Sequence, residues 1–122
     1  MKNSVLIGPS SFAEIDDAPL KDLMNAGFNV IHNPFKRKIE EHELIALLTE
    51  DVIGIIAGLE QLDKNVLSKS NLRIISRVGS GVSNIDHKYS KENNIKIFSI
   101  PESRDRVDVL NFSKYHLVNI SL

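Results

Sequence analysis

The chain has 122 residues, of which 42% are hydrophobic and 25% are charged, the proportions of one ordinary globular domain. Fifteen basic and sixteen acidic side chains leave a formal charge of −1, so the composition predicts no nucleic-acid partner and no anionic-membrane partner. The absence of cysteine excludes disulfides, thiolate metal sites and cysteine nucleophiles. Because no apolar run approaches the ~20 residues of a membrane helix and no signal peptide is recognisable, we expect a cytoplasmic protein.

Short apolar runs alternate with helical patterns from the start of the chain. Residues 4–7 form a continuous apolar run that ends at Gly8 and Pro9, which is typical of a strand covered on both faces. A helix is expected to begin near Pro19 and to end at Gly27, because apolar residues between them recur at i, i+3 and i+4. These two elements form the first strand–helix unit.

The middle of the chain repeats this alternation. A second strand is expected at residues 28–32. The next helix begins near Glu40, where a cluster of acidic residues favours a helix N-terminus, and its apolar stripe continues to Val52. The apolar run at residues 52–57 predicts a third strand.

The last part of the alternation contains two further strands. Asp63 is a plausible N-cap of a short helix, and residues 72–78 form the fourth apolar run. A loop with two glycines follows, and then a helix begins at Asp86 and runs to about Asn93. The fifth strand is expected at residues 95–100. Strands that alternate with helices at this spacing require right-handed crossovers and a parallel sheet.

We therefore predict an α/β fold, a flavodoxin-like three-layer sandwich around a five-stranded parallel sheet in the order 2-1-3-4-5. The predicted domain covers residues 1–101. Residues 102–122 form an apolar C-terminal tail whose irregular spacing fits one helix or two. We expect this tail to pack on its own core or on a partner.

The loop after the fourth strand carries the strongest signal for a binding site. In open parallel sheets, ligands bind beyond the carboxyl ends of the strands. Gly79 and Gly81 flank Ser80, so the backbone can turn tightly and its amide N–H groups can converge on an anion. Arg77 offers a planar fork that matches a carboxylate. The alternative is that the glycines only permit a tight turn and that Arg77 is a solvated charge.

The run IISRVGSGVSNID at residues 74–86 resembles the N-terminal domain of D-isomer-specific 2-hydroxyacid dehydrogenases, and phosphoglycerate dehydrogenase and its kin are the most similar by motif. Residues 55–67 are similar to the family's third strand and the helix after it. Residues 91–97 are similar to the helix and last strand before the crossover into the coenzyme domain. The resemblance covers roughly residues 5–101.

The resemblance implies a set of substrate-binding residues. Arg77 is placed like a family side chain that approaches the substrate carboxylate, and Gly79, Ser80 and Gly81 are placed like the loop whose backbone amides bind the same group. The family prefers an aspartate where this chain has Ser83. Some relatives also carry an arginine where this chain has Gly58, so the resemblance does not specify which hydroxyacid is bound.

The family's dinucleotide domain has no counterpart in the sequence. A third glycine is missing after Gly79 and Gly81, and no residue matches the family's catalytic arginine, glutamate and histidine. The resemblance thus implies the substrate-binding half of an NAD-dependent D-2-hydroxyacid dehydrogenase, truncated before the NAD-binding domain and inactive alone. This half binds no cofactor itself, and NAD belongs to the complete enzyme.

The partners expected on this basis are a small 2-hydroxy or 2-oxo acid, a separate NAD-binding chain, and a second copy of the chain through residues 102–122. The alternative is a non-catalytic module, derived from that domain, that binds a small anion or a protein. The histidines lie on separate predicted elements, so no metal site is expected. No serine has the histidine and acid pattern that would make it a nucleophile.

Overall fold

The computed structural model describes residues 3–8, 21, 24–25, 27–78 and 83–100. Three predicted features fall largely or wholly outside these residues: the first helix, the glycine loop and the C-terminal tail. The described residues comprise the sheet, the three helices after the second strand, and most of the loops that connect them.

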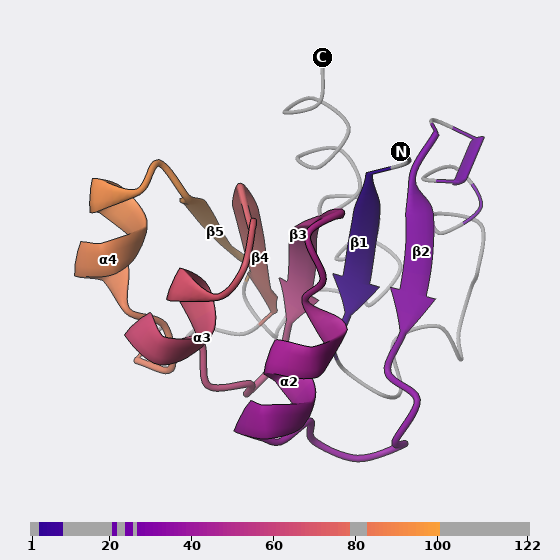
Figure 1. Cartoon of the computed structure of the whole chain (residues 1–122), viewed down its shortest axis with the longest axis horizontal. Helices are drawn as coiled ribbons and strands as arrows, with labels where there is room; N and C mark the ends of the chain where they lie inside the picture. Colours follow the sequence, from indigo (N-terminus) through magenta and orange to yellow (C-terminus); the bar gives the residue numbers. More distant parts are fainter. Residues whose placement is uncertain (1–2, 9–20, 22–23, 26, 79–82, 101–122) are drawn as a thin grey trace.

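Five parallel strands form one sheet in the order β2-β1-β3-β4-β5 (Figure 1). This arrangement confirms the predicted α/β class and the predicted strand order. The strands are β1 (Ser4–Ile7), β2 (Asn29–His32), β3 (Val52–Ala57), β4 (Ile74–Val78) and β5 (Lys96–Ile100). Some strands begin slightly later than predicted, because the apolar pattern reports burial rather than pairing: Leu72 is already buried before the β4 ladder begins.

Helices α2 (Glu41–Leu47), α3 (Lys64–Ser68) and α4 (His87–Glu92) lie on one face of this sheet (Figure 1). The strand register places Leu6 beside Ile55 and Ile55 beside Ile75, which gives an apolar row across the sheet. Leu44 of α2 and Val66 of α3 pack with this row in one buried cluster. In the described part of the chain, no helix has the length and apolar character needed to span a membrane.

Side chains on the other face of the sheet are buried as well. Val5, Ile7, Ile56 and Ile74 are at most 1% exposed. Strands buried on both faces explain why β1 and β3 are continuous apolar runs instead of alternating ones. The predicted helical layer on this face concerns residues outside the described part of the chain.

One prediction about an element boundary is wrong. The apolar stripe of α2 was expected to continue to Val52, but the helix ends at Leu47 and Val52 is the first residue of β3. A turn separates the two elements, with the Val52 N–H donating to the Thr49 carbonyl at 3.0 Å. Val52 packs in the same buried cluster as Leu44, so its side chain continued the apolar stripe although its backbone belongs to the strand.

Two aspartates begin helices near the carboxyl ends of the strands, as predicted. An Asp63 side-chain oxygen accepts the Val66 N–H at 3.0 Å and caps α3. The Asp86 side chain likewise accepts the Tyr89 N–H at 2.9 Å and caps α4. These caps fix where each helix starts, and therefore how far the preceding loop extends beyond the sheet.

Candidate functional site

The carboxyl ends of all five strands lie along one edge of the sheet, because every pair of neighbours is parallel (Figure 1). The loops after β1, β3 and β4 start at neighbouring points on this edge. In doubly wound sheets the ligand crevice lies where the strand order reverses, and in the order 2-1-3-4-5 that point is between β1 and β3. The loops after β1 and β3 lie on the two sides of this point.

The side chain of Glu60 fills the space between the ends of β1 and β3. Glu60 is only 2% exposed, and its Oε1 accepts the Gly58 N–H at 2.7 Å. A Cβ placed on Gly8 would overlap this Oε1 and would lie 2.9 Å from the Glu60 Cδ and 3.1 Å from the Ile56 carbonyl oxygen. The carboxyl group thus occupies the crevice, and it can do so only because Gly8 has no side chain.

Burial raises the pKa of the Glu60 carboxyl above its ordinary value, since a buried site disfavours the charged form. The Gly58 hydrogen bond opposes this effect, as do the positive charges of Arg77 and Lys38. Glu60 was not among the predicted site residues. The signal for it was present, since an acidic residue placed just after a buried parallel strand lies at the edge where ligands bind.

Arg77 lies on β4, one residue before the strand ends, and its side chain is buried. Only 4% of the residue is exposed, so the alternative that Arg77 is a solvated charge is wrong. Its Nε donates to the Asn84 Oδ1 at 3.2 Å. The guanidinium is therefore held inside the protein at the carboxyl edge, beside the loop that was predicted to bind an anion.

Asn84 joins the loop after β4 to the loop after β3. Its Nδ2 donates to the Glu60 carbonyl at 2.7 Å and to the Gly58 carbonyl at 3.2 Å. The backbone adds a parallel bridge between Leu62 and Ile85. Asn84 lies in the family motif at residues 74–86, but the sequence alone indicates no role for it. Nothing in the local pattern shows that its side-chain amide contacts a loop that follows another strand.

The predicted binding loop itself, Gly79, Ser80 and Gly81, lies outside the described residues. Its role as an anion nest therefore remains a prediction. The structure does describe the residues on both sides of it, Arg77 and Asn84, and brings their side chains together.

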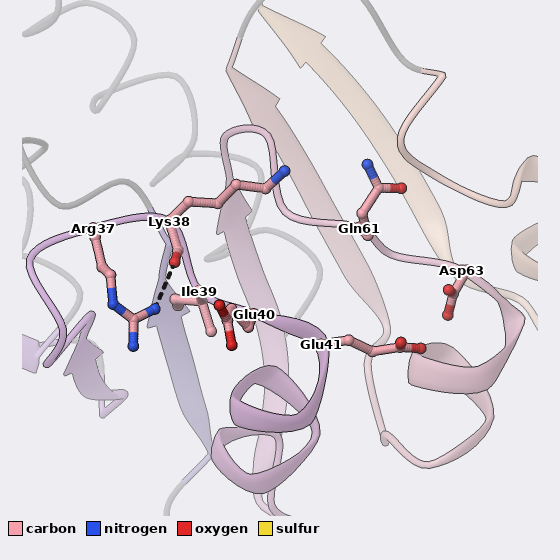
Figure 2. Close-up of a pocket in the computed structure, with 7 residues that line it drawn as sticks. All are labelled: Arg37, Lys38, Ile39, Glu40, Glu41, Gln61 and Asp63. Atoms are coloured by element: carbon pink, nitrogen blue, oxygen red, sulfur yellow. Dashed lines mark hydrogen bonds between the residues drawn. The ribbon is translucent and has the colours of Figure 1, made fainter.

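A hollow of about 530 Å³ lies at the same edge, between the loops that lead into α2 and α3. Figure 2 shows its lining residues, Arg37, Lys38, Ile39, Glu40, Glu41, Gln61 and Asp63. Most of its charges already have partners within the protein. Arg37 forms two hydrogen bonds with Glu43, at 2.8 and 2.7 Å, Glu41 accepts a hydrogen bond from the Asn65 side chain at 3.0 Å, and Asp63 caps α3. These charged side chains thus stabilise the loop before α2 and the first turns of α2 and α3.

The described residues contain no cluster of three or more side chains suited to hold a metal ion. They also do not fit the pyrophosphate of a dinucleotide. At the crevice between β1 and β3 a pyrophosphate would meet the Glu60 carboxyl group, which already accepts the Gly58 N–H. A pyrophosphate site needs converging N–H donors, and this crevice presents an acidic group instead. The binding of an anion is therefore disfavoured there.

Comparison with known proteins identifies the family. A sequence model described as "D-isomer specific 2-hydroxyacid dehydrogenase, catalytic domain" matches residues 10–107. The chain belongs to this family. The resemblance read from residues 74–86 is thereby confirmed. No curated protein matches the chain significantly.

Solved structures of 2-hydroxyacid dehydrogenases share the fold. A 3-phosphoglycerate dehydrogenase from Entamoeba histolytica matches 81% of this chain with a TM-score of 0.64 and 18% identity, over 33% of its own length. A D-mandelate dehydrogenase from Rhodotorula graminis matches 81% with a TM-score of 0.59 and 18% identity, over 31% of its length. A phosphoglycerate oxidoreductase from Vibrio cholerae matches 83% with a TM-score of 0.58 and 15% identity. The chain thus spans about a third of the length of these relatives.

Proposed function

We propose that this domain is the substrate-binding half of an NAD-dependent D-2-hydroxyacid dehydrogenase, acting in the cytoplasm and inactive alone. It binds the carboxylate of a small 2-hydroxy or 2-oxo acid at the carboxyl edge beside β4. One observation carries the proposal: Arg77 is buried at this edge, with its Nε held by Asn84. NAD supplies the redox chemistry in the complete enzyme, and its binding residues lie elsewhere than in the described part of this chain.

The chemistry of a buried guanidinium supports a carboxylate ligand. A guanidinium presents parallel N–H groups that match the two oxygens of a carboxylate, and such charge-assisted pairs are stronger than neutral hydrogen bonds. Burial strengthens the pair further, because less water screens it. The backbone N–H groups of Gly79, Ser80 and Gly81 complete the site in this proposal by converging on the same carboxylate.

Titration with malonate and D-glycerate tests the proposal. We expect the amide NMR signals of residues 79–82 to shift with a dissociation constant in the millimolar range, about 4 kcal/mol, since in this proposal the domain supplies only one half of the binding cleft. Arg77→Ala should weaken binding at least about tenfold, the size of one lost charge-assisted contact.

Arg73→Ala is the matched control. Arg73 directly precedes β4 at the opposite edge of the sheet and is exposed, so its removal changes the net charge equally but leaves the site intact. Equal affinity in the Arg77→Ala variant and the wild type would show that Arg77 does not bind the carboxylate. Shifts that avoid residues 79–82 would show that this loop is only a turn.

A further inference from the structure

The side-chain amide of Asn84 has a hydrogen-bond partner for each of its polar atoms. The Oδ1 accepts from the Arg77 Nε at 3.2 Å, and the Nδ2 donates to the carbonyl oxygens of Glu60 at 2.7 Å and Gly58 at 3.2 Å. These partners also fix the orientation of the amide. If it were turned over, its oxygen would face two carbonyl oxygens and its NH2 would face the Arg77 N–H.

An amide suits this position better than a carboxylate. Asn84 accepts a hydrogen bond from Arg77 without neutralising its charge, whereas an aspartate would form an ion pair with it. Among the described residues, no carboxylate lies within ion-pair distance of Arg77. The Glu60 carboxyl group is nearby, but its hydrogen bond goes to Gly58. Within the described part of the chain, the positive charge of Arg77 is therefore not neutralised by an ion pair.

The backbone around Asn84 is held independently of its side chain. The Leu62 N–H donates to the Asn84 carbonyl at 2.8 Å, and the Asp86 N–H donates to the Leu62 carbonyl at 2.9 Å. Asp86 also caps α4. Because these contacts use main-chain atoms and a different side chain, the loop should keep its path when the Asn84 side chain is changed.

We propose that Asn84 is the positioning residue of the carboxylate site, holding Arg77 by its Nε so that a ligand carboxylate is bound end-on, by the Nη1 and Nη2 groups. This inference rests on the proposed function, that Arg77 binds a carboxylate. It adds the geometry of recognition: a guanidinium can bind a carboxylate side-on, through Nε and one Nη, or end-on, through both Nη groups. Because the Arg77 Nε–H is already bonded to Asn84, a ligand carboxylate can bind only in the end-on arrangement.

The wild-type chain tests the binding geometry without any substitution. The Arg77 side chain is followed by NMR on 15N-labelled protein while malonate is added. End-on binding predicts that the Nη signals of Arg77 shift and the Nε–H signal moves little. If the Nε–H signal shifts most, malonate displaces Asn84 and the proposed geometry is wrong.

Two variants test the positioning role. Asn84→Ala should weaken malonate binding roughly tenfold, the size expected for the loss of one hydrogen bond to a charged group, and should speed the exchange of the Arg77 Nε–H with water. Asn84→Asp keeps an acceptor for Arg77 but adds a negative charge, so it should weaken binding more than Asn84→Ala does. The added negative charge should also slow the exchange of the Arg77 Nε–H with water in Asn84→Asp. If Asn84 only stabilised the loop, this exchange would become faster instead, because a carboxylate oxygen would face the carbonyl oxygens of Gly58 and Glu60 and would loosen the loop around Arg77.

The matched control is Asn71→Ala. The Asn71 side chain also ties two loops together, donating to the Glu50 carbonyl at 2.9 Å, but it does so before β4, away from Arg77. This variant should bind malonate as the wild type does, with an unchanged Arg77 Nε–H signal. Urea midpoints of all variants show whether a weakened affinity accompanies a general loss of stability.

The outcomes separate this inference from the proposed function. If Arg77→Ala abolishes malonate binding while Asn84→Ala keeps the wild-type affinity and Nε–H exchange rate, Asn84 has no positioning role and the proposed function stands. If the wild type binds no malonate, the proposed function fails and the end-on geometry fails with it. The Nε–H exchange rate, which needs no ligand, then still decides whether Asn84 holds Arg77.

Discussion

Glu60 places a carboxyl group where doubly wound sheets bind their ligands. Burying this group costs free energy, which the Gly58 N–H and the nearby charges of Arg77 and Lys38 offset in part. Because this group fills the crevice between β1 and β3, the proposed function places the ligand at the neighbouring position, beside β4. At this position the structure holds Arg77 and Asn84. Single side chains thus decide which part of the carboxyl edge is available for binding.

The contact between Glu60 and Gly8 leads to a stability prediction. Gly8→Ala should destabilise the protein by about 1–3 kcal/mol, the usual cost of an extra group in a packed site, because the new Cβ would overlap the Glu60 carboxyl group. In a Glu60→Ala background the same substitution should cost less. Urea unfolding of the four proteins measures the coupling.

Gly27→Ala is the control for this cycle. A Cβ at Gly27 would meet no atom within 4 Å, but the residue has a φ of +98°, which an alanine rarely adopts. Its cost is therefore conformational and should be the same with or without the Glu60 side chain. If Gly8→Ala costs equally in both backgrounds, the close contact with Glu60 does not limit the size of residue 8.

The loop that leads into α2 is organised by side chains around its own start. Asn33 accepts the Phe35 N–H at 2.8 Å, and its Nδ2 donates to the carbonyls of Arg37 at 2.6 Å and Gly8 at 2.8 Å. The Arg37 guanidinium lies 4.9 Å from the centre of the Phe35 ring and pairs with Glu43 in the first turn of the helix. These contacts fix the path of the loop between β2 and α2.

Because of the Arg37–Glu43 pair, we expect the stability of the protein around α2 to depend on pH. Hydrogen bonds from Arg37, and then from the Glu40 N–H, lower the pKa of Glu43 from an ordinary value of 4.5 to about 2. A lowered pKa in the folded state means that the stabilisation is fully present above pH 4.5 and is lost as the pH falls toward 2. Glu43→Gln should therefore be less stable than the wild type near neutral pH and equally stable at about pH 2.

Urea midpoints measured from pH 7 down to pH 2 check this expectation. Glu92→Gln, at the exposed end of α4, is the control and should follow the wild type across the whole range. A stability difference between Glu43→Gln and the wild type that is as large at pH 2 as at pH 7 would show that the charge of Glu43 is not its source.

The order of elements was predictable because each one has a local signal. Continuous apolar runs marked the strands, and Asp63 and Asp86 marked two helix starts, so the alternation alone favoured a parallel sheet. Local patterns also explain the error at Val52, whose side chain faces the same core as α2. The contacts of Glu60 and Asn84 could not be predicted in this way, because they join loops that follow different strands and depend on how the sheet brings these loops together.

At the level of the whole molecule, the carboxyl ends of the five parallel strands lie along one edge of the sheet. The family match over residues 10–107 includes β2 to β5 and all the loops between them. The described helices cover one face, and the crossovers from β3 and β4 bring Glu60, Arg77 and Asn84 together. In the proposed function this chain supplies one half of a ligand site. Solved relatives about three times as long show that the fold also occurs beside further structure.

If this chain is one half of the enzyme, the 122 residues should bind the coenzyme only weakly and should not turn over substrate. We expect NADH to bind with a dissociation constant no tighter than ~100 μM, since the sequence lacks a third glycine after Gly79 and Gly81 and the Glu60 carboxyl group fills the crevice between β1 and β3. Titration calorimetry with NADH measures this directly. NMR spectra of the same protein preparation with malonate serve as the control, because shifts in residues 79–82 would show that the protein is folded and able to bind a carboxylate. Formation of NADH from NAD with D-glycerate or lactate should be undetectable for the same reason. Tight NADH binding, or turnover that scales with the amount of pure protein and is lost in Arg77→Ala, would show that this chain contains a complete active site and would overturn the proposal that it is one half of the enzyme.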